Sequence, residues 1–279
     1  MEKKKNPNHH GAKMNFQQVL TDAVDDFLTY GFDSQKRVDE WTKKIKDSAL
    51  KSMGSEQTIQ RQMEKSLKSV YSRLITNKGL LKQNVNISAF TIEKLKPKLR
   101  AELDRRIMAS ANLIKLNRQE AISNTIRRFQ GWATSIPKGG SKAVPKQKSK
   151  TGIKKGIGRV SFLERRVIID QTHKLTASIN DIVALDSGAI AAKWRSHWKQ
   201  PFYNYREDHK ERDQKIYTIP DNWAIKKGLM KSGTVGYTTE ITQPGEEVFC
   251  RCNYVYLYNL RQLPDDMLTK KGKESLGIK

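Results

Sequence analysis

Residues 248–257 read Val248-Phe249-Cys250-Arg251-Cys252-Asn253-Tyr254-Val255-Tyr256-Leu257. Apolar and aromatic residues alternate here with other types, a pattern that is typical of a β-strand. Successive side chains of a strand point to opposite faces, so we expect both cysteines on one face. Two shorter runs of similar texture, 215–219 and 234–241, precede this stretch between prolines and glycines. Together the three runs predict a small, irregular, mostly antiparallel sheet.

Helical periodicity dominates the chain before this sheet. Apolar residues recur at helical spacing over 16–28, 38–49, 59–74, and from Ser88 past Pro97 to Phe129. Periodicity resumes over 162–190, where it predicts two helices broken near 186–188. We therefore expect an α+β fold with a mostly helical region over 15–136 and an α+β domain over 160–264.

The segment 137–159 between these regions is predicted to be a flexible basic linker. It contains five glycines and two prolines, has no acidic residue, and offers almost nothing apolar to bury. We also expect disorder over 1–14 and a loose polar tail over 265–279. The linker cations are Lys138, Lys142, Lys146, Lys148, Lys150, Lys154, Lys155 and Arg159.

The charge balance indicates a polyanionic partner. Lys and Arg number 53 against 29 for Asp and Glu, which leaves a formal charge of +24. A basic segment gains free energy on any phosphate polymer through counterion release, so we expect non-specific binding to double-stranded DNA by the eight linker cations. A linker that only aids solubility is the alternative. Neither a membrane-spanning run nor a secretory leader is recognised, so no membrane partner is expected.

Cys250 and Cys252 are the only cysteines, and we interpret them as reduced thiols. With His209, and His197 as a further donor, they could supply thiolate and imidazole ligands to zinc. A one-residue spacer is shorter than the usual spacing of structural zinc sites, so the sequence assigns no metal and no cofactor. The alternative is two small side chains packed on a strand face, with His209 in a hydrogen bond.

Three blocks of the C-terminal half resemble a known family. They are Lys193-Trp194-Arg195-Ser196-His197, Arg206-Glu207-Asp208-His209-Lys210-Glu211-Arg212-Asp213, and Pro244-Gly245-Glu246-Glu247-Val248-Phe249-Cys250-Arg251-Cys252. Their order and spacing over about 160–260 resemble the phage Mu F-like minor head proteins, also called head-morphogenesis proteins. The motif residues are Trp194, His197, Arg206, His209, Asp213, Glu247, Cys250, Arg251 and Cys252.

The resemblance implies a structural, non-enzymatic component of a tailed-phage head. Such a protein is made in the host cytoplasm, resides in the virion at the portal vertex or capsid interior, contacts packaged DNA, and acts in head assembly, genome packaging or ejection. Its implied partners are the portal protein and other head or scaffolding proteins. Two positions depart from the family pattern, because Gln214 replaces a common Gly after Asp213, and Phe249 replaces a frequent Asn before Cys250.

Two other functions remain open from the residues. The first is a nuclease-like enzyme with an acid/base or metal centre drawn from His209, Asp213, Glu246 and His197. The second is a basic host protein that binds nucleic acid without any virion. No Walker loop, His-Glu-x-x-His motif or nucleophile elbow occurs in the chain.

Overall fold

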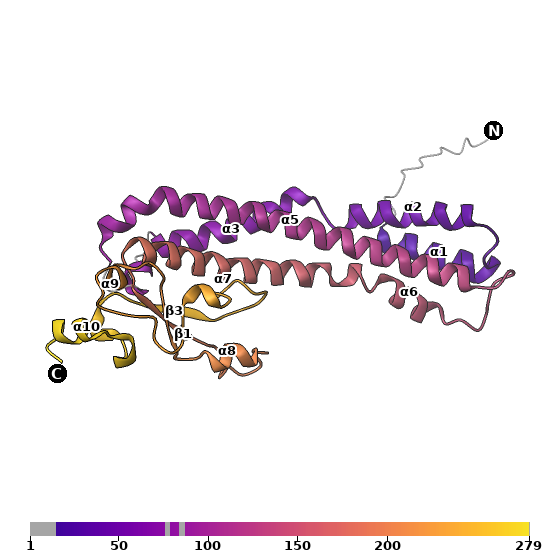
Figure 1. The fold of residues 1–279 in the computed structure, drawn as a ribbon. Helices are drawn as coiled ribbons and strands as arrows, with labels where there is room; N and C mark the ends of the chain where they lie inside the picture. Colours follow the sequence, from indigo (N-terminus) through magenta and orange to yellow (C-terminus); the bar gives the residue numbers. More distant parts are fainter. Residues whose placement is uncertain (1–14, 76–78, 84–86, 279) are drawn as a thin grey trace, which may run out of the picture. The chain divides into compact units, whose positions relative to one another are not determined.

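The computed structural model describes residues 15–75, 79–83 and 87–278 and has an α+β fold, as expected. The expected disorder of 1–14 lies outside the described residues. The long helices are α1 (Phe16–Tyr30), α2 (Gln35–Ser52), α3 (Glu56–Ile75), α5 (Ala89–Ser135) and α7 (Val160–Asp186). The short ones are α4 (Gly79–Gln83), α6 (Lys146–Lys154), α8 (Glu207–Glu211), α9 (Trp223–Lys226) and α10 (Lys270–Ser275), and the strands are β1 (Ala191–Arg195), β2 (Ile216–Thr218) and β3 (Asn253–Leu257) (Figure 1).

The chain divides into two compact units, each of which takes two stretches of sequence. Unit 1 comprises 1–59 and 113–164, and unit 2 comprises 60–112 and 165–279. The expected succession of regions 15–136, 137–159 and 160–264 therefore does not follow the units. The reason is that α5 supplies its first half to unit 2 and its second half to unit 1. Pro97 lies inside α5 and does not end it.

Unit 1 is built on α1, α2, the second half of α5, and α6. Its core holds one face of α1 together with Ile122 and Phe129 of α5. Phe27 and Phe129 pack edge to face with ring centroids 5.8 Å apart, so the positive edge of one ring meets the negative face of the other. The Asn15 side chain accepts a hydrogen bond from the Gln18 amide at 3.0 Å and begins α1. Local capping and one apolar stripe thus explain why this segment is helical.

The prediction that 137–159 lacks structure is wrong. Residues 146–154 form α6, a 3-10 turn (Ile157–Arg159) follows, and Ile153 is 2% exposed within the core of unit 1. The Gly139 amide donates to the Tyr30 carbonyl, and Ser141 donates to Leu28. Gly31 makes the approach possible, because a Cβ there would lie 1.8 Å from the Pro137 oxygen. Counting charges along the segment could not reveal this contact.

Unit 2 contains α7 from residue 165 onward (Figure 1) and a three-stranded antiparallel sheet in the order β2-β1-β3. The break expected near 186–188 is present, because α7 ends at Asp186. The second helix expected after it is absent, and the chain enters β1 instead. Apolar residues at 190–192 extended the helical pattern and concealed this central strand. Ala191 pairs with both Thr218 and Leu257, which places β1 at the centre of the sheet.

Three further expectations need correction. The strand expected over 248–257 is confirmed only for 253–257, and residues 234–241 hold a 3-10 turn, Thr238–Glu240, in place of a strand. The tail after Pro264 is folded, because it forms the 3-10 turn Asp265–Met267 and α10 and buries Met267 and Leu268. Met267, Leu268 and Leu276 pack on the core of unit 2, and backbone hydrogen bonds join this stretch to residues 229–231, although its composition is polar. The fourth short turn is Leu260–Gln262.

In the described ranges, none of the helices has both the length and the apolar composition needed to cross a bilayer.

Candidate functional site

The three sequence blocks at 193–197, 206–213 and 244–252 meet in unit 2. Trp194 lies on β1, His209 lies on α8, and the two cysteines lie just before β3. Trp194 is fully buried, and its ring packs edge to face on His209 with centroids 5.2 Å apart. A helix only five residues long is therefore anchored against the central strand by one aromatic contact.

His209 and both cysteines form a buried cluster. Their exposed fractions are 1% for His209, 2% for Cys250 and 6% for Cys252. The Cys250 and Cys252 Sγ atoms lie 3.6 Å and 3.5 Å from the same His209 Nδ1. Both thiols thus approach the same ring nitrogen, but neither cysteine lies in a strand, because β3 begins at Asn253, so the expected strand face that carries both is not formed.

The other ring nitrogen of His209 faces two carboxylates. Its Nε2 lies 3.7 Å from a Glu247 oxygen and 3.9 Å from an Asp208 oxygen. Each carboxylate also has an arginine, because Glu247 pairs with Arg206, and Asp208 pairs with Arg212 at 2.8 Å. Arg206 additionally donates to the Val248 carbonyl at 2.9 Å. Arg206 thus connects the start of α8 to the loop that carries the cysteines, whereas the Asp208–Arg212 pair lies within α8 and its C-cap.

The two thiols influence each other's ionisation. The hydrogen bond with Cys252 lowers the pKa of Cys250 to about 5, against the effect of burial. The same contact and burial raise the pKa of Cys252 above its ordinary range. The pair therefore accommodates one negative charge readily beside the His209 ring.

Asp213 organises the turn after α8. Its carboxylate accepts hydrogen bonds from the Ser196 amide at 2.8 Å and from the Trp198 indole at 3.2 Å. Burial raises the pKa of Asp213, but these hydrogen bonds outweigh it and hold the pKa below its ordinary value. Asp213 belongs to neither of the groups of metal-ligand residues found among the described residues. The arrangement makes Asp213 a positioning residue of the turn.

Both departures from the family pattern fall at left-handed backbone positions. Gln214 has φ 66° and Phe249 has φ 62°, a region that Gly and Asn adopt more easily than other residues. The Phe249 ring is covered by Arg166, whose Cζ lies 3.7 Å from the ring centroid. The backbone amide of Phe249 donates a hydrogen bond to the Asp170 carboxylate at 2.6 Å. Packing and hydrogen bonding hold Phe249 in this conformation.

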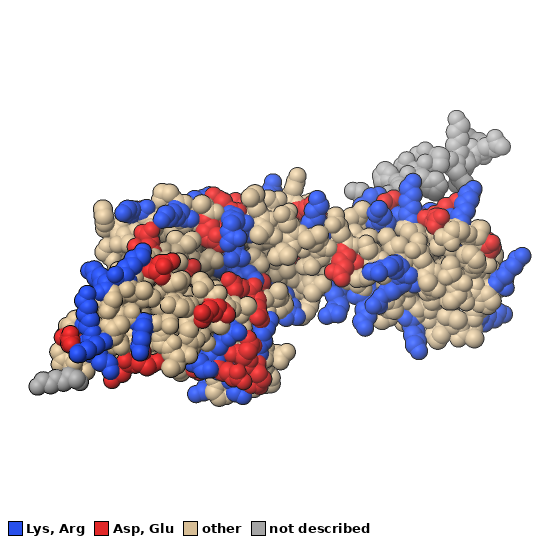
Figure 2. All heavy atoms as spheres, in the orientation of Figure 1, with Lys and Arg blue, Asp and Glu red and all other residues tan. Residues whose placement is uncertain are grey.

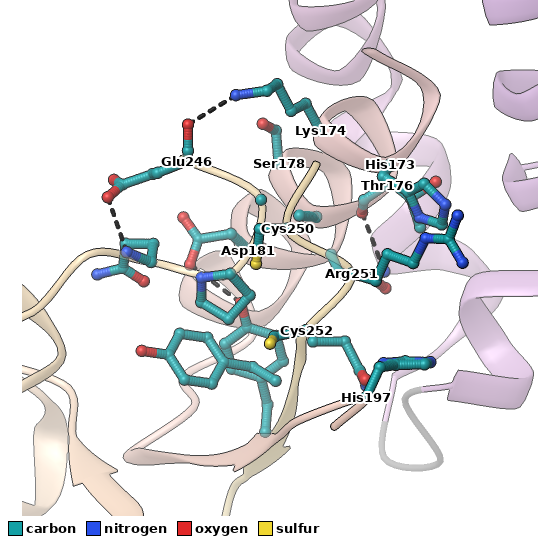
Figure 3. A pocket seen from close by; sticks show the side chains of 18 of the residues that line it. His173, Lys174, Thr176, Ser178, Asp181, His197, Glu246, Cys250, Arg251 and Cys252 are labelled. Carbon is teal, nitrogen blue, oxygen red and sulfur yellow. Dashed lines mark hydrogen bonds between the residues drawn. The ribbon is translucent and has the colours of Figure 1, made fainter. Parts of the chain in front are cut away.

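A cavity of 590 Å³ borders the cysteines (Figure 3). It is lined by residues of α7, by residues 243–246 and 250–256, which include part of β3, and by His197, Arg105 and Arg106. Burial lowers the pKa of His173, and the neighbouring Arg251 and His197 lower it further. Burial raises the pKa of Asp181, which accepts a hydrogen bond from Tyr256 at 3.1 Å. The lining thus carries both basic and acidic groups.

The structure separates the residues of the enzyme hypothesis. His197 and Glu246 line the cavity, whereas His209 and Asp213 do not. Glu246 accepts a hydrogen bond from the Gln243 amide at 2.7 Å. Two residues that were assigned no role from the sequence also belong to the site. They are Asp208, which faces His209, and Tyr203, whose hydroxyl contacts the Phe249 carbonyl and the Arg251 amide. A carboxylate directly before His209 was the available signal for Asp208.

The eight cations of 137–159 lie on the surface of unit 1. Six are exposed, and Lys150 and Lys154 are half-buried. Among the ion pairs of the described residues, only Lys146 has an acidic partner in this set, Asp25. In Figure 2, basic side chains project from the surface over α6, with few acidic ones among them. The structure thus holds these charges outward on a folded support.

Comparison of the chain with models of protein families, with curated proteins and with solved structures finds no match.

Proposed function

We propose that this chain is a structural minor head protein of a tailed phage that binds packaged double-stranded DNA without sequence preference. On this proposal it associates with the portal and other head or scaffolding proteins, resides in the virion, and acts in head assembly, genome packaging or ejection. Its role is non-enzymatic and requires no catalytic cofactor.

One observation carries the DNA-binding part of the proposal. Residues 137–159 present eight cations from a segment without a single acidic residue, and seven of the eight have no ion-pair partner among the described residues. Helix α2 in the same unit is also rich in lysine, but Asp39, Glu40 and Asp47 are interspersed there. An unneutralised array favours phosphate, because each contact releases a condensed counterion.

The packing of the motif residues supports the head-protein part. Residues that resemble the Mu F-like family come from three separate blocks and contact one another around His209, Trp194 and Cys250. Convergence of this kind is expected when a motif describes one structural centre. Arg206 of the second block also donates to the Val248 carbonyl in the third.

DNA binding is tested with charge-removing substitutions, because deletion of the segment would remove Ile153 from the core. The variant Lys142→Gln/Lys148→Gln/Lys155→Gln changes three exposed side chains. We expect weaker binding to duplexes of unrelated sequence. The log–log salt dependence should become shallower by about 0.9 for each phosphate that the variant no longer neutralises.

The matched control is Lys43→Gln/Lys46→Gln/Lys51→Gln on α2, which removes the same charge from exposed positions of the same unit. The control should retain most of the affinity and slope of the parent. If both variants lost the same DNA affinity, the net charge of the protein would explain binding and residues 137–159 would have no special role. No binding by the parent at low ionic strength would contradict the proposal outright.

Virion association requires a separate measurement. Mass spectrometry of purified phage particles should detect the chain together with the portal protein, and its absence from the particle fraction would remove the phage role. Incubation with DNA and RNA in Mg²⁺, Mn²⁺ and Zn²⁺ should give no cleavage. Cleavage that is lost in His209→Ala would instead favour the enzyme.

A further inference from the structure

We propose that Cys250, Cys252 and His209 bind a zinc ion through their two Sγ atoms and the His209 Nδ1. The three residues are buried, and these ligand atoms all lie within 4.8 Å of one another. They come from two parts of the chain, α8 and the loop before β3. Their spacing, the second nitrogen of His209 and the adjoining cavity each support the site.

The distances fit the edges of a tetrahedron around zinc. Zinc binds thiolate sulfur at about 2.3 Å and imidazole nitrogen at about 2.0–2.1 Å, so sulfur and nitrogen ligands of one tetrahedral ion lie about 3.6 Å apart. The observed separations from Nδ1 are 3.6 Å for Cys250 and 3.5 Å for Cys252. Both sulfur atoms therefore already lie at ligand spacing from the nitrogen.

Hydrogen bonding alone does not explain the two equal contacts. An imidazole nitrogen has either one proton to donate or one lone pair to accept with, so Nδ1 serves one sulfur well at a time. Here two sulfurs approach the same Nδ1 at nearly the same distance. A cation between the three atoms would satisfy all of them together.

The second ring nitrogen has the surroundings of a metal-bound histidine. Such a histidine donates its other N–H to a carboxylate, carbonyl or water, which fixes the ring orientation. His209 Nε2 is buried, has no closer hydrogen-bond partner among the described residues, and faces Glu247 at 3.7 Å. Glu247 is paired with Arg206 and Asp208 with Arg212. We therefore assign both carboxylates to orienting the His209 ring and not to binding the metal.

The donor set selects the metal and leaves one position open. Two thiolates and an imidazole favour zinc over Mg²⁺ or Ca²⁺, which take oxygen ligands. No fourth His, Cys, Asp or Glu joins this group in the described ranges. Cys250 and Cys252 both line the cavity in Figure 3, so a water molecule from the cavity can complete the tetrahedron.

The bound ion would fasten α8 to the loop that carries the cysteines. This loop includes the left-handed Phe249, and α8 alone has only five residues. Because the metal binds only the folded arrangement, it stabilises unit 2 by mass action.

The experiment uses the full-length chain, purified without a metal-binding tag and with a phosphine reductant that keeps the thiols reduced. Elemental analysis should find one equivalent of zinc. Replacement by Co²⁺ should give the intense visible bands of a tetrahedral site and a near-ultraviolet thiolate charge-transfer band. Cys252→Ser should lower zinc affinity at least tenfold, and Glu247→Gln by about 10–100-fold.

His197→Gln is the matched control, because His197 lines the same cavity but lies outside the proposed ligand set. It should retain the zinc content and cobalt spectrum of the parent. If Cys252→Ser fails to fold, the parent with a chelator gives the answer, since its thermal midpoint should fall and recover when zinc is restored. A parent that binds neither metal, or a Cys252→Ser protein that keeps its zinc, overturns the proposal.

Discussion

The Arg118 guanidinium binds the Glu164 carboxylate at 2.6 Å, and both side chains are almost enclosed, with 6% and 13% exposed. Arg118 also donates to the carbonyls of Met53 and Gly54 at 2.7 Å and 3.1 Å, where α2 ends. One side chain of α5 thus satisfies the end of α2 and the first turns of α7 within unit 1. Such a group is costly to remove, because the Glu164 carboxylate would keep its mostly enclosed position without a partner.

Replacement of Arg118 by alanine should therefore destabilise unit 1 strongly. We expect Arg118→Ala to lower the free energy of unfolding by about 3–5 kcal/mol, since it leaves the mostly enclosed Glu164 carboxylate without its partner and two carbonyls without this donor. Lys146→Gln, which removes the exposed pair with Asp25, should cost less than about 1 kcal/mol. Chemical denaturation measures the free energy of unfolding of both variants. Equal decreases would contradict the prediction that the enclosed Arg118 pair stabilises the protein more than the exposed Lys146 pair.

Gly31 should tolerate no side chain. Gly31 and Gly54 share positive φ values of 72° and 69°, but a Cβ at Gly54 meets nothing within 4 Å, whereas one at Gly31 collides with the backbone of Pro137. Gly54→Ala should cost about 1–2 kcal/mol for the left-handed backbone alone. Gly31→Ala should cost clearly more and should raise hydrogen exchange at the Gly139 and Ser141 amides. Similar costs for both variants would contradict the close contact.

Gln214→Gly should stabilise the protein. Gln214 is exposed and left-handed, so glycine relieves backbone strain without losing a buried contact. The expected gain is about 0.5–1 kcal/mol, because glycine also makes the unfolded chain more flexible. Thermal unfolding measures the gain, and a loss of stability in Gln214→Gly would show that the side chain contributes more than its conformation costs.

Glu102 should contribute to the acid sensitivity of unit 2. Burial raises its pKa, but the Arg105 and Arg106 hydrogen bonds prevail and hold the pKa below its ordinary value of 4.5. A lowered pKa in the folded state means that the contribution is complete above pH 4.5 and is lost as the pH falls through the folded-state pKa.

Glu102→Gln tests this linkage. The variant should be less stable than the parent by about 1–2 kcal/mol at neutral pH, because the acceptor loses its charge. The gap should narrow as the pH falls below 4.5. Denaturation over a pH series would measure it, and a constant gap would mean that Glu102 is not an ionised acceptor in the fold.

Much of the secondary structure was predictable, because helical periodicity depends on neighbouring residues. The stripes of α1, α2 and α3 and the length of α5 followed from spacing alone. Strand β1 was missed because Ile190 and its alanine neighbours fit a helical pattern equally well. For the candidate site, the cysteines, His209 and Trp194 were identifiable as residues, but their mutual distances were not.

The amino-acid sequence by itself determined the α+β class, the large positive charge, and the residue types available to hold a metal, since these are sums or local repeats. Tertiary structure decided that 137–159 is folded, because Gly31 and Ile153 act through contacts with distant backbone and core atoms. It also brought His209 to the two thiols, about 40 residues further along the chain. Contacts of that range depend on how the elements pack, which no local pattern encodes.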